Sequence, residues 1–153
     1  MKNLKRVQMV DITQKKDVYR EATAQARIKL KKETIDLIKN GNIEKGDPIL
    51  VAEVAAILAA KNTSQIIPLC HPIPITGVET KHKIYDEYLE VEVKVKTTAK
   101  TGVEMEALSA ATAYMLTIWD MVKKYEKDEL GQYPNTIIEY IKVKEKVKGV
   151  QDE

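Results

Sequence analysis

Acidic and basic side chains recur at short spacings along residues 100–128, which read KTGVEMEALSAATAYMLTIWDMVKKYEKD. Glu104 and Glu106 stand near the start of this stretch, and Asp120 and Lys123 stand toward its end. Carboxylates and lysines of this kind can exchange protons with a substrate and can bind phosphate groups. Their simplest structural interpretation is different: a helix cap at the start and a surface ion pair at the end.

A stiff segment upstream carries the one cysteine and one of the two histidines. Residues 66–75 read IIPLCHPIPI, and their prolines push the preceding residues into extended conformations. Adjacent side chains of an extended chain point to opposite sides, so Cys70 and His71 are not expected to hydrogen-bond each other, which disfavours a cysteine hydrolase. His71 could act as an acid, a base or a phosphate ligand, whereas a buried thiol is the common outcome for Cys70.

Lys45 stands just before a predicted helix start, in the run Lys45-Gly46-Asp47-Pro48. Asp47 is a suitable N-cap and Pro48 a suitable first helical residue. The start of a helix favours anions, and the lysine adds a formal charge. The run is not a Walker A loop, and a Lys-Gly pair is also common in solvated turns.

A single long helix is expected over residues 100–128, because Thr101 and Glu104 have capping-box spacing and the interior is rich in Ala, Leu and Met. Glu106 falls on its polar side. The predicted apolar arc comprises Val103, Ala107, Leu108, Ala111, Tyr114, Met115, Ile118, Met121, Val122 and Tyr125. At about 1.5 Å per residue, Glu104 and Asp120 are roughly 24 Å apart. If both are functional, a site built from two subunits is the economical explanation.

Alternation of apolar and polar residues predicts strands at 21–30, 78–85, 88–98 and 136–143. Shorter helices are predicted at 33–39 and 49–61. The apolar side of the second is predicted to hold Ile49, Val51, Val54, Ile57 and Leu58. The order β-α-α-β-β-α-β predicts an α+β fold, a ferredoxin-like two-layer sandwich with a mostly antiparallel four-stranded sheet packed by helices.

The composition suits one globular domain over residues 1–153, with 44% hydrophobic and 31% charged residues and a polar, flexible segment over 1–20. A net charge of +2 does not imply nucleic acid. One cysteine excludes an intrachain disulfide and favours a reducing, cytoplasmic location, and one cysteine with two histidines is too few for a structural zinc site. Neither a membrane span nor a secretion signal is expected.

Six blocks of the sequence resemble, in order and spacing, the molybdenum cofactor biosynthesis protein C family, MoaC. The resemblance covers about residues 9 to 130, and the PLCHP and TGVEMEAL blocks together are its most specific part. The blocks are Met9-Val10-Asp11-Ile12, Arg20-Glu21-Ala22, Lys45-Gly46-Asp47, Ile67-Pro68-Leu69-Cys70-His71-Pro72, residues 100–108 (KTGVEMEAL) and Asp120-Met121-Val122-Lys123.

This resemblance implies a lyase of molybdenum cofactor (molybdopterin) biosynthesis. The reaction converts 3′,8-cyclo-7,8-dihydro-GTP into cyclic pyranopterin monophosphate and releases pyrophosphate. The resemblance also implies a homohexamer of three dimers with active sites at the dimer interface. No cofactor is firmly implied, although Mg²⁺ could accompany the triphosphate. The expected partners are a small-molecule substrate and further copies of the chain, without nucleic acid or membrane.

The resemblance also assigns residues. The family's substrate contacts fall on Leu69, Cys70, His71, Met105 and Glu106. Its catalytic aspartate falls on Asp120, as the expected acid or base, and its essential lysines fall on Lys45 and Lys123. Glu104 and Arg20 are expected to assist, the arginine at the departing pyrophosphate. The C-terminal end departs from the family's Gly-Gly-Lys-Ser-Gly run, so the family's C-terminal lysine maps to Lys142 or Lys144 or is missing.

Two alternatives to an enzyme stay open on sequence. A nucleic-acid-binding ferredoxin-like domain would need exposed aromatic residues and a basic face, but the chain has no Phe, and Tyr88 is the only aromatic residue in the second strand of the predicted hairpin. A family member that only scaffolds would have lost catalytic residue types, and every assigned position retains a competent one.

Overall fold

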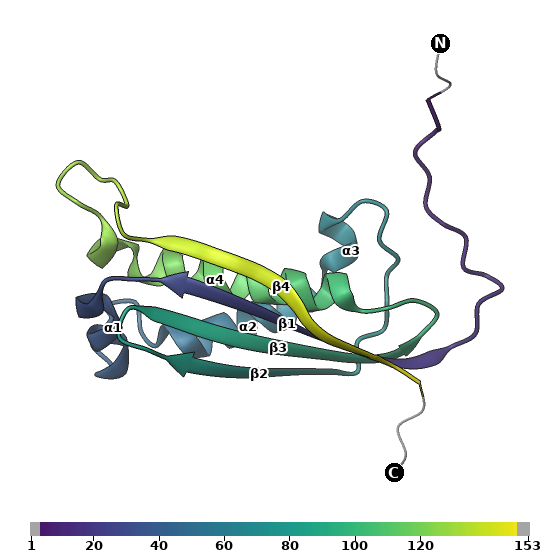
Figure 1. Cartoon of the computed structure of the whole chain (residues 1–153), viewed down its shortest axis with the longest axis horizontal. Helices are drawn as coiled ribbons and strands as arrows, with labels where there is room; N and C mark the ends of the chain where they lie inside the picture. Colours follow the sequence, from purple (N-terminus) through teal and green to yellow (C-terminus); the bar gives the residue numbers. More distant parts are fainter. Residues whose placement is uncertain (1–3, 150–153) are drawn as a thin grey trace.

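One antiparallel sheet and a layer of helices on one of its faces make up the computed structural model, which describes residues 4–149 (Figure 1). The strand order is β2-β3-β1-β4, and every neighbouring pair is antiparallel. The strands are β1 (Val18–Lys29), β2 (Gly77–Ile84), β3 (Tyr88–Ala99) and β4 (Ile137–Lys148). The helices are α1 (Lys32–Lys39), α2 (Pro48–Lys61), α3 (Thr63–Ile66) and α4 (Glu104–Glu126). The predicted α+β, ferredoxin-like sandwich is confirmed.

The central strand β1 presents small side chains to the helix layer. Ala22, Ala24 and Ala26 are each at most 1% exposed and lie beside valines of β3. Because alanine projects little from the sheet, α4 can pack closely over β1, as the sequence predicted. The core of the molecule therefore lies between the sheet and α4.

Helix α2 packs with the side opposite to the predicted one. Its buried face consists of Ala52, Ala56 and Ala60, which allow a close approach to α4. The predicted apolar side is wrong apart from Ile49, because its other members are 40–57% exposed. These exposed side chains, with Leu50 beside them, form what we call the α2 aliphatic face: Leu50, Val51, Val54, Ile57 and Leu58.

Helix α4 begins later than predicted and without the capping box. Its N-cap is Val103, which is 1% exposed and makes no side-chain cap hydrogen bond. With Thr101 as N-cap the helix would begin at residue 102. Because Val103 is buried in the core and is itself the N-cap, the helix begins two residues later, at Glu104. The predicted apolar arc is largely buried, but so are Glu106 and Ala110 from the other side, because α4 is covered by both the sheet and α2.

Other boundaries differ by a few residues. Strand β1 begins at Val18, inside the segment expected to be flexible, and β4 continues to Lys148. The short helix α3 was not predicted. In Figure 1 the N-terminal segment runs away from the body before the chain enters β1. None of the helices within residues 4–149 is long and apolar enough to cross a membrane.

A buried carboxylate ties the end of α4 to its neighbours. Glu126 is 0% exposed, and it accepts hydrogen bonds from the Lys31 backbone N–H at 3.2 and 3.3 Å. The Thr136 hydroxyl donates to it at 2.7 Å, and the Thr34 hydroxyl also donates to it. Glu126 thus caps the start of α1 from another helix and holds the entry to β4.

The Glu126→Ala variant should lower the free energy of unfolding by about 3 kcal/mol, because two buried hydroxyls and a partly buried backbone N–H lose their acceptor. Urea denaturation followed by far-UV circular dichroism measures this loss. Glu129→Ala, which removes an exposed carboxylate from the next loop, is the matched control and should change stability little. Equal stability of the two variants would contradict the bridging role.

Candidate active site

Three predicted residues meet at the C-terminal end of α4. Lys45 Nζ lies 3.2 Å from both the backbone oxygen and Oδ2 of Asp120. Lys123 Nζ lies 2.9 Å from the other carboxylate oxygen of the same side chain. All three side chains are about half exposed. We call this cluster of Lys45, Asp120 and Lys123 the lysine half-site.

The lysine half-site is charged in its resting state. The Lys123 and Lys45 hydrogen bonds hold the pKa of Asp120 below its ordinary value, and the Asp120 hydrogen bond raises the pKa of Lys123. Asp120 is therefore ionised at neutral pH, which suits it to hold two ammonium groups or to accept a proton better than to donate one. Two cations beside one carboxylate leave a net positive charge for phosphate oxygens.

Asp47 caps the start of α2, next to this half-site, as predicted. It is the N-cap of α2, and Asp47 Oδ1 accepts from Ile49 N at 2.9 Å. Lys45 lies two residues before this cap, in a turn closed by a hydrogen bond from Gly46 N to Ile43 O of 3.1 Å. The lysine therefore projects from a tight turn and not from the helix itself.

A buried carboxylate lies at the opposite end of α4. Glu106 is 3% exposed, and its Oε2 accepts from Cys70 Sγ at 3.8 Å. Its Oε1 has no hydrogen-bond partner among residues 4–149. A buried, unpaired carboxylate oxygen is rare in protein interiors and marks a position where a ligand group could bind.

Burial sets the proton affinity of this pair. It raises the pKa of Glu106 to about 7, with the Glu104 charge adding to the effect. Burial and the Glu106 charge also raise the pKa of Cys70, so the thiol stays protonated and is a poor nucleophile. Glu106 can thus donate or accept a proton near neutral pH, whereas a cysteine hydrolase gains no support.

His71 points away from Cys70, toward the N-terminal segment, as the extended backbone predicted. Its Nε2 lies 2.6 Å from the Val10 carbonyl oxygen, and Lys100 Nζ lies 3.2 Å from the Thr13 oxygen. Because a carbonyl oxygen only accepts, Nε2 is the nitrogen that carries the hydrogen. Residues 10–13 therefore lie beside His71 and Lys100, near the N-terminal end of α4.

Glu104 folds back over the loop before α4. A Cβ at Gly102 would lie 2.4 Å from Glu104 Oε2, so a larger residue there would require the Glu104 side chain to move. Burial opposes ionisation of Glu104, but the Lys146 ammonium and a backbone N–H hold its pKa below the ordinary value. The ion pair of Glu104 with Lys146 brings β4 to the start of α4.

Arg20 also reaches this end, at 8% exposure. Its guanidinium donates to the Ala99 and Lys100 carbonyl oxygens at 3.4 and 3.5 Å, and its charge contributes to the lowered pKa of Glu104. Met105 and Leu69 are 39% and 47% exposed, so their apolar surfaces are open to a planar ring. We call the set Arg20, Leu69, Cys70, His71, Glu104, Met105, Glu106 and Lys146 the carboxylate half-site.

The structure does not bring Lys142 to either half-site. Lys142 pairs with Gln25 on the sheet face away from the helices, and Lys144 forms an ion pair with Glu92 there. A β-bulge between the partners of Thr23 and Ala24 inserts one extra residue into β4. The bulge turns Lys146 to the helix side, whereas regular alternation would leave lysines 142, 144 and 146 on one face. Sequence reasoning missed Lys146 for this reason.

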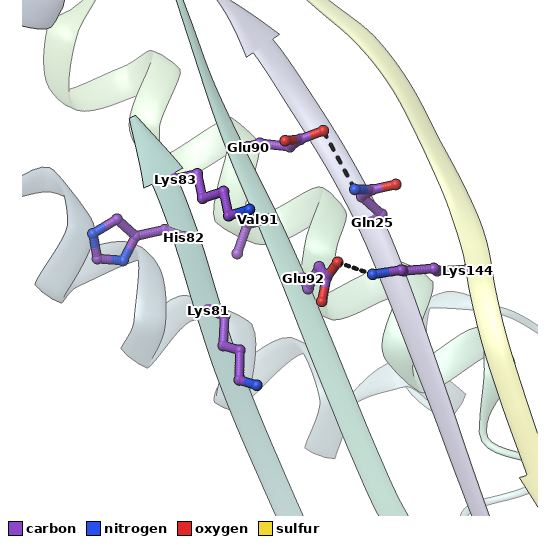
Figure 2. Close-up of a pocket in the computed structure, with 8 residues that line it drawn as sticks. All are labelled: Gln25, Lys81, His82, Lys83, Glu90, Val91, Glu92 and Lys144. Carbon is purple, nitrogen blue, oxygen red and sulfur yellow. Dashed lines mark hydrogen bonds and ion pairs between the residues drawn. The ribbon is translucent and has the colours of Figure 1, made fainter. Parts of the chain in front are cut away.

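The open face of the sheet holds a hollow of about 740 Å³ that is distinct from both half-sites (Figure 2). Figure 2 shows Lys81 and Lys83 of β2 on the face turned away from the helices, with dashed links joining Gln25 to Glu90 and Glu92 to Lys144. Because Glu90 and Glu92 line the hollow beside Lys81, Lys83 and Lys144, opposite charges largely cancel there, and the hollow offers a triphosphate little net attraction.

Three aromatic rings on the open face, those of Tyr85, Tyr88 and Tyr140, already have partners. Tyr85 and Tyr88 stack with their centroids 4.4 Å apart, and the Arg27 guanidinium lies 4.5 Å from the Tyr88 ring and 5.3 Å from the Tyr140 ring. Single-stranded nucleic acids need free aromatic faces for base stacking. The nucleic-acid-binding alternative therefore gains no support from this face.

The fold and these two clusters fit a class of ferredoxin-like proteins whose acid–base side chains and lysines suit chemistry on a small phosphorylated molecule. The particular family follows from comparison, because the MoaC family model matches residues 9–149 and the chain belongs to the MoaC family.

Curated relatives agree over nearly the whole length. A protein of Pyrococcus furiosus is 57% identical over 144 residues, covering 94% of this chain and 92% of the relative. One of Aeropyrum pernix is 58% identical over 141 residues, covering 92% and 97%. One of Methanosarcina mazei is 51% identical over 144 residues, covering 94% and 92%. Each is named "Probable cyclic pyranopterin monophosphate synthase".

Proposed function

We propose that this chain is a cyclic pyranopterin monophosphate synthase of molybdenum cofactor biosynthesis. It would convert 3′,8-cyclo-7,8-dihydro-GTP into cyclic pyranopterin monophosphate, with a substrate oxygen attacking the α-phosphorus and pyrophosphate leaving. The observation that carries the proposal is the convergence of Lys45 and Lys123 on Asp120, in a chain that belongs to the MoaC family. Two lysines held by one carboxylate suit chemistry on a phosphorylated substrate, and the names of the relatives refer to such chemistry.

The two half-sites divide the chemistry. Lys45 and Lys123 neutralise charge that develops on the departing pyrophosphate, and Asp120 orients both ammonium groups. Opening and rebuilding the ring system needs proton transfers, for which Glu106, with a pKa of about 7, is the best-matched acid or base. We also propose that Arg20 and Lys146, which add cationic charge near Glu104, contact the substrate. The same role is proposed for Lys142.

A divalent cation would enter with the triphosphate, since Mg²⁺ is commonly held by substrate phosphates. Within residues 4–149 no group of three or more His, Cys, Asp or Glu side chains could hold a metal ion. The single thiol and the nucleotide-derived substrate favour a cytoplasmic location.

One subunit alone cannot close the site around a small substrate. Glu106 and Asp120 lie 14 residues apart on one straight helix, which separates the half-sites by roughly 21 Å. We therefore propose that the lysine half-site of one subunit faces the carboxylate half-site of a second. The expected assembly is a hexamer of three such dimers.

The α2 aliphatic face supplies a surface for this pairing. In two antiparallel copies of α2 related by a two-fold axis at Val54, Leu50 would lie opposite Leu58 of the partner subunit and Val51 opposite Ile57 of the partner subunit. The same axis would set Asp47, at the start of α2, opposite the partner's Lys61, at the end of α2. Apolar and charged positions are thus both self-complementary.

This pairing would also join the half-sites. Lys45 precedes the start of α2, and residues 69–71 follow closely after its end. Antiparallel packing therefore carries the lysine half-site of one subunit toward the carboxylate half-site of the other. Five aliphatic side chains exposed on one helix are otherwise costly in water.

Incubating the chain with the cyclised GTP intermediate tests the proposed function. Wild type should release pyrophosphate in equal amount to cyclic pyranopterin monophosphate, measured by phosphatase-coupled assay and chromatography. Lys45→Ala and Asp120→Ala should each lower kcat/KM by at least about 100-fold, because each disrupts the cationic cluster. Absence of pyrophosphate release by wild type would overturn the assignment.

A further inference from the structure

The turn that carries Lys45 is attached to α4 through a tyrosine that no catalytic assignment includes. Residues 43–46 form the turn, with Glu44 and Lys45 at its two central positions. In such a turn the first central N–H has no acceptor within the turn itself. The Glu44 N–H instead donates to the Tyr125 hydroxyl oxygen at 2.9 Å.

Tyr125 is itself firmly held. Its ring is partly buried and packs against the core, and its carbonyl oxygen accepts from Lys31 Nζ at 3.0 Å. It lies five residues after Asp120 and two after Lys123 on the same helix. The hydroxyl therefore fixes the Lys45 turn relative to the helix that bears the other two members of the lysine half-site.

The other links between this turn and α4 are weaker. The ion pairs of Lys45 with Asp120 and of Lys124 with Glu44 join side chains that are about half to two-thirds exposed. Exposed pairs of this kind contribute little and are screened by salt. A substrate phosphate would moreover compete for Lys45 and Lys123. The neutral hydrogen bond between Glu44 and Tyr125 would then still join the turn to α4.

The backbone of residues 43–46 is held at Ile43 and has an unusual conformation at Gly46. Gly46, the last residue of the turn, has φ +112°, a conformation that other residues rarely adopt. Ile43, at 5% exposure, anchors the turn on the side before Lys45. Among residues 4–149, the Glu44–Tyr125 hydrogen bond is the one hydrogen bond of Glu44 or Lys45 with α4 that involves no charged group.

We propose that Tyr125 is a positioning residue that acts through Lys45, a role that rests on the proposed function of the lysine half-site. Displacing a catalytic group by about 1 Å can cost roughly 100-fold in rate. Loss of one hydrogen bond leaves the turn mobile without removing it. A loss of about tenfold is therefore the expected size of the effect.

The test is a double-mutant cycle in the full-length chain. Tyr125→Phe keeps the ring and removes the hydroxyl, and it should lower kcat/KM for pyrophosphate release about tenfold. In the Lys45→Ala background, followed by single-turnover measurement, the same change should have almost no further effect. Hydrogen exchange at the Glu44 amide should also become faster in Tyr125→Phe.

Tyr140→Phe is the matched control. Its hydroxyl donates to Glu90 at 2.7 Å on the open face of the sheet, so the variant also loses one tyrosine hydrogen bond but should keep full activity. Full activity of Tyr125→Phe, or an equal loss with and without Lys45, would overturn the positioning role while leaving the proposed function intact. Full activity of Lys45→Ala would instead overturn the lysine assignment, and the positioning role with it.

Discussion

The Glu106→Gln variant is expected to lose roughly 100- to 10,000-fold in kcat, because it keeps the shape of a proton-transferring side chain and removes its ionisation. The wild-type rate should show an inflection near pH 7, the pKa to which burial raises Glu106, and the residual rate of the variant should lack it. Pyrophosphate release measured from pH 5.5 to 9 tests both features.

Stability should change in the opposite direction. The folded-state pKa of Glu106 lies above its unfolded value, so the folded state binds more protons between about pH 4.5 and 7. Stability is thus lost as pH rises through this window and stays low above it. At pH 8 the free energy of unfolding of Glu106→Gln should be about 1 to 3 kcal/mol higher than that of wild type, since the variant buries no charge.

Glu87→Gln, at an exposed position in the β2–β3 turn, serves as the control and should match wild type in both measurements. An active Glu106→Gln variant with an unchanged pH profile would assign the proton transfers to other residues. Activity lost together with stability at pH 8 would point to a structural role for the carboxylate. The opposite signs of the two effects therefore identify a functional group whose burial is costly to the fold.

The order of strands and helices was predictable because local periodicity determines it. The alternation of Ala22, Ala24 and Ala26 identified a half-buried strand, and their small size indicated a closely packed helix. The Asp120–Lys123 ion pair was predictable from their spacing on one helix, whereas Lys45 was connected with them only through the family resemblance. Nothing local brings a turn before α2 to the last turns of α4.

The orientation of α2 was not predictable from hydrophobicity. A helix that is apolar on all sides does not reveal which side faces its own chain. Here the small residues Ala52, Ala56 and Ala60 face α4, because close helix packing favours them, and the larger aliphatic residues stay exposed. The larger aliphatic residues left exposed are the ones that the proposed dimer would cover.

The remaining site errors have local causes that a sequence does not display. Glu106 looked exposed because one helix face was assumed to be buried, whereas α4 is covered on two sides. Lys146 was missed because one extra residue in β4 reverses the alternation. Both errors concern the carboxylate half-site, where burial of a charge and a bulge depart from regular patterns, as is common at functional sites.

Mixing two inactive variants is expected to restore activity if the site is shared between subunits. Lys45→Ala damages only the lysine half-site, and Glu106→Gln damages only the carboxylate half-site. In a heterodimer one site then carries both changes and the other carries neither. Random reassembly of equal amounts makes half of the dimers heterodimers, so about a quarter of wild-type activity should return.

The control mixture combines Lys45→Ala with Asp120→Ala. Both changes lie in the lysine half-site, so every site retains one of them and no activity should return. Recovery in this mixture, or its absence in the first, would contradict a shared site. Co-expression with two different affinity tags and tandem purification isolates the heterodimer, in which activity should reach about half of wild type.

The α2 aliphatic face can be tested in the same system. Val54→Glu places a charge at the proposed two-fold axis, where it would meet its own copy at low dielectric, so the variant should dissociate and lose activity while keeping its far-UV spectrum. Leu130→Glu, which alters an aliphatic side chain that is 83% exposed in the loop after α4, should remain assembled and active. A Val54→Glu variant that is monomeric yet fully active would contradict the shared site, because one chain would then act across the roughly 21 Å between Glu106 and Asp120 on α4.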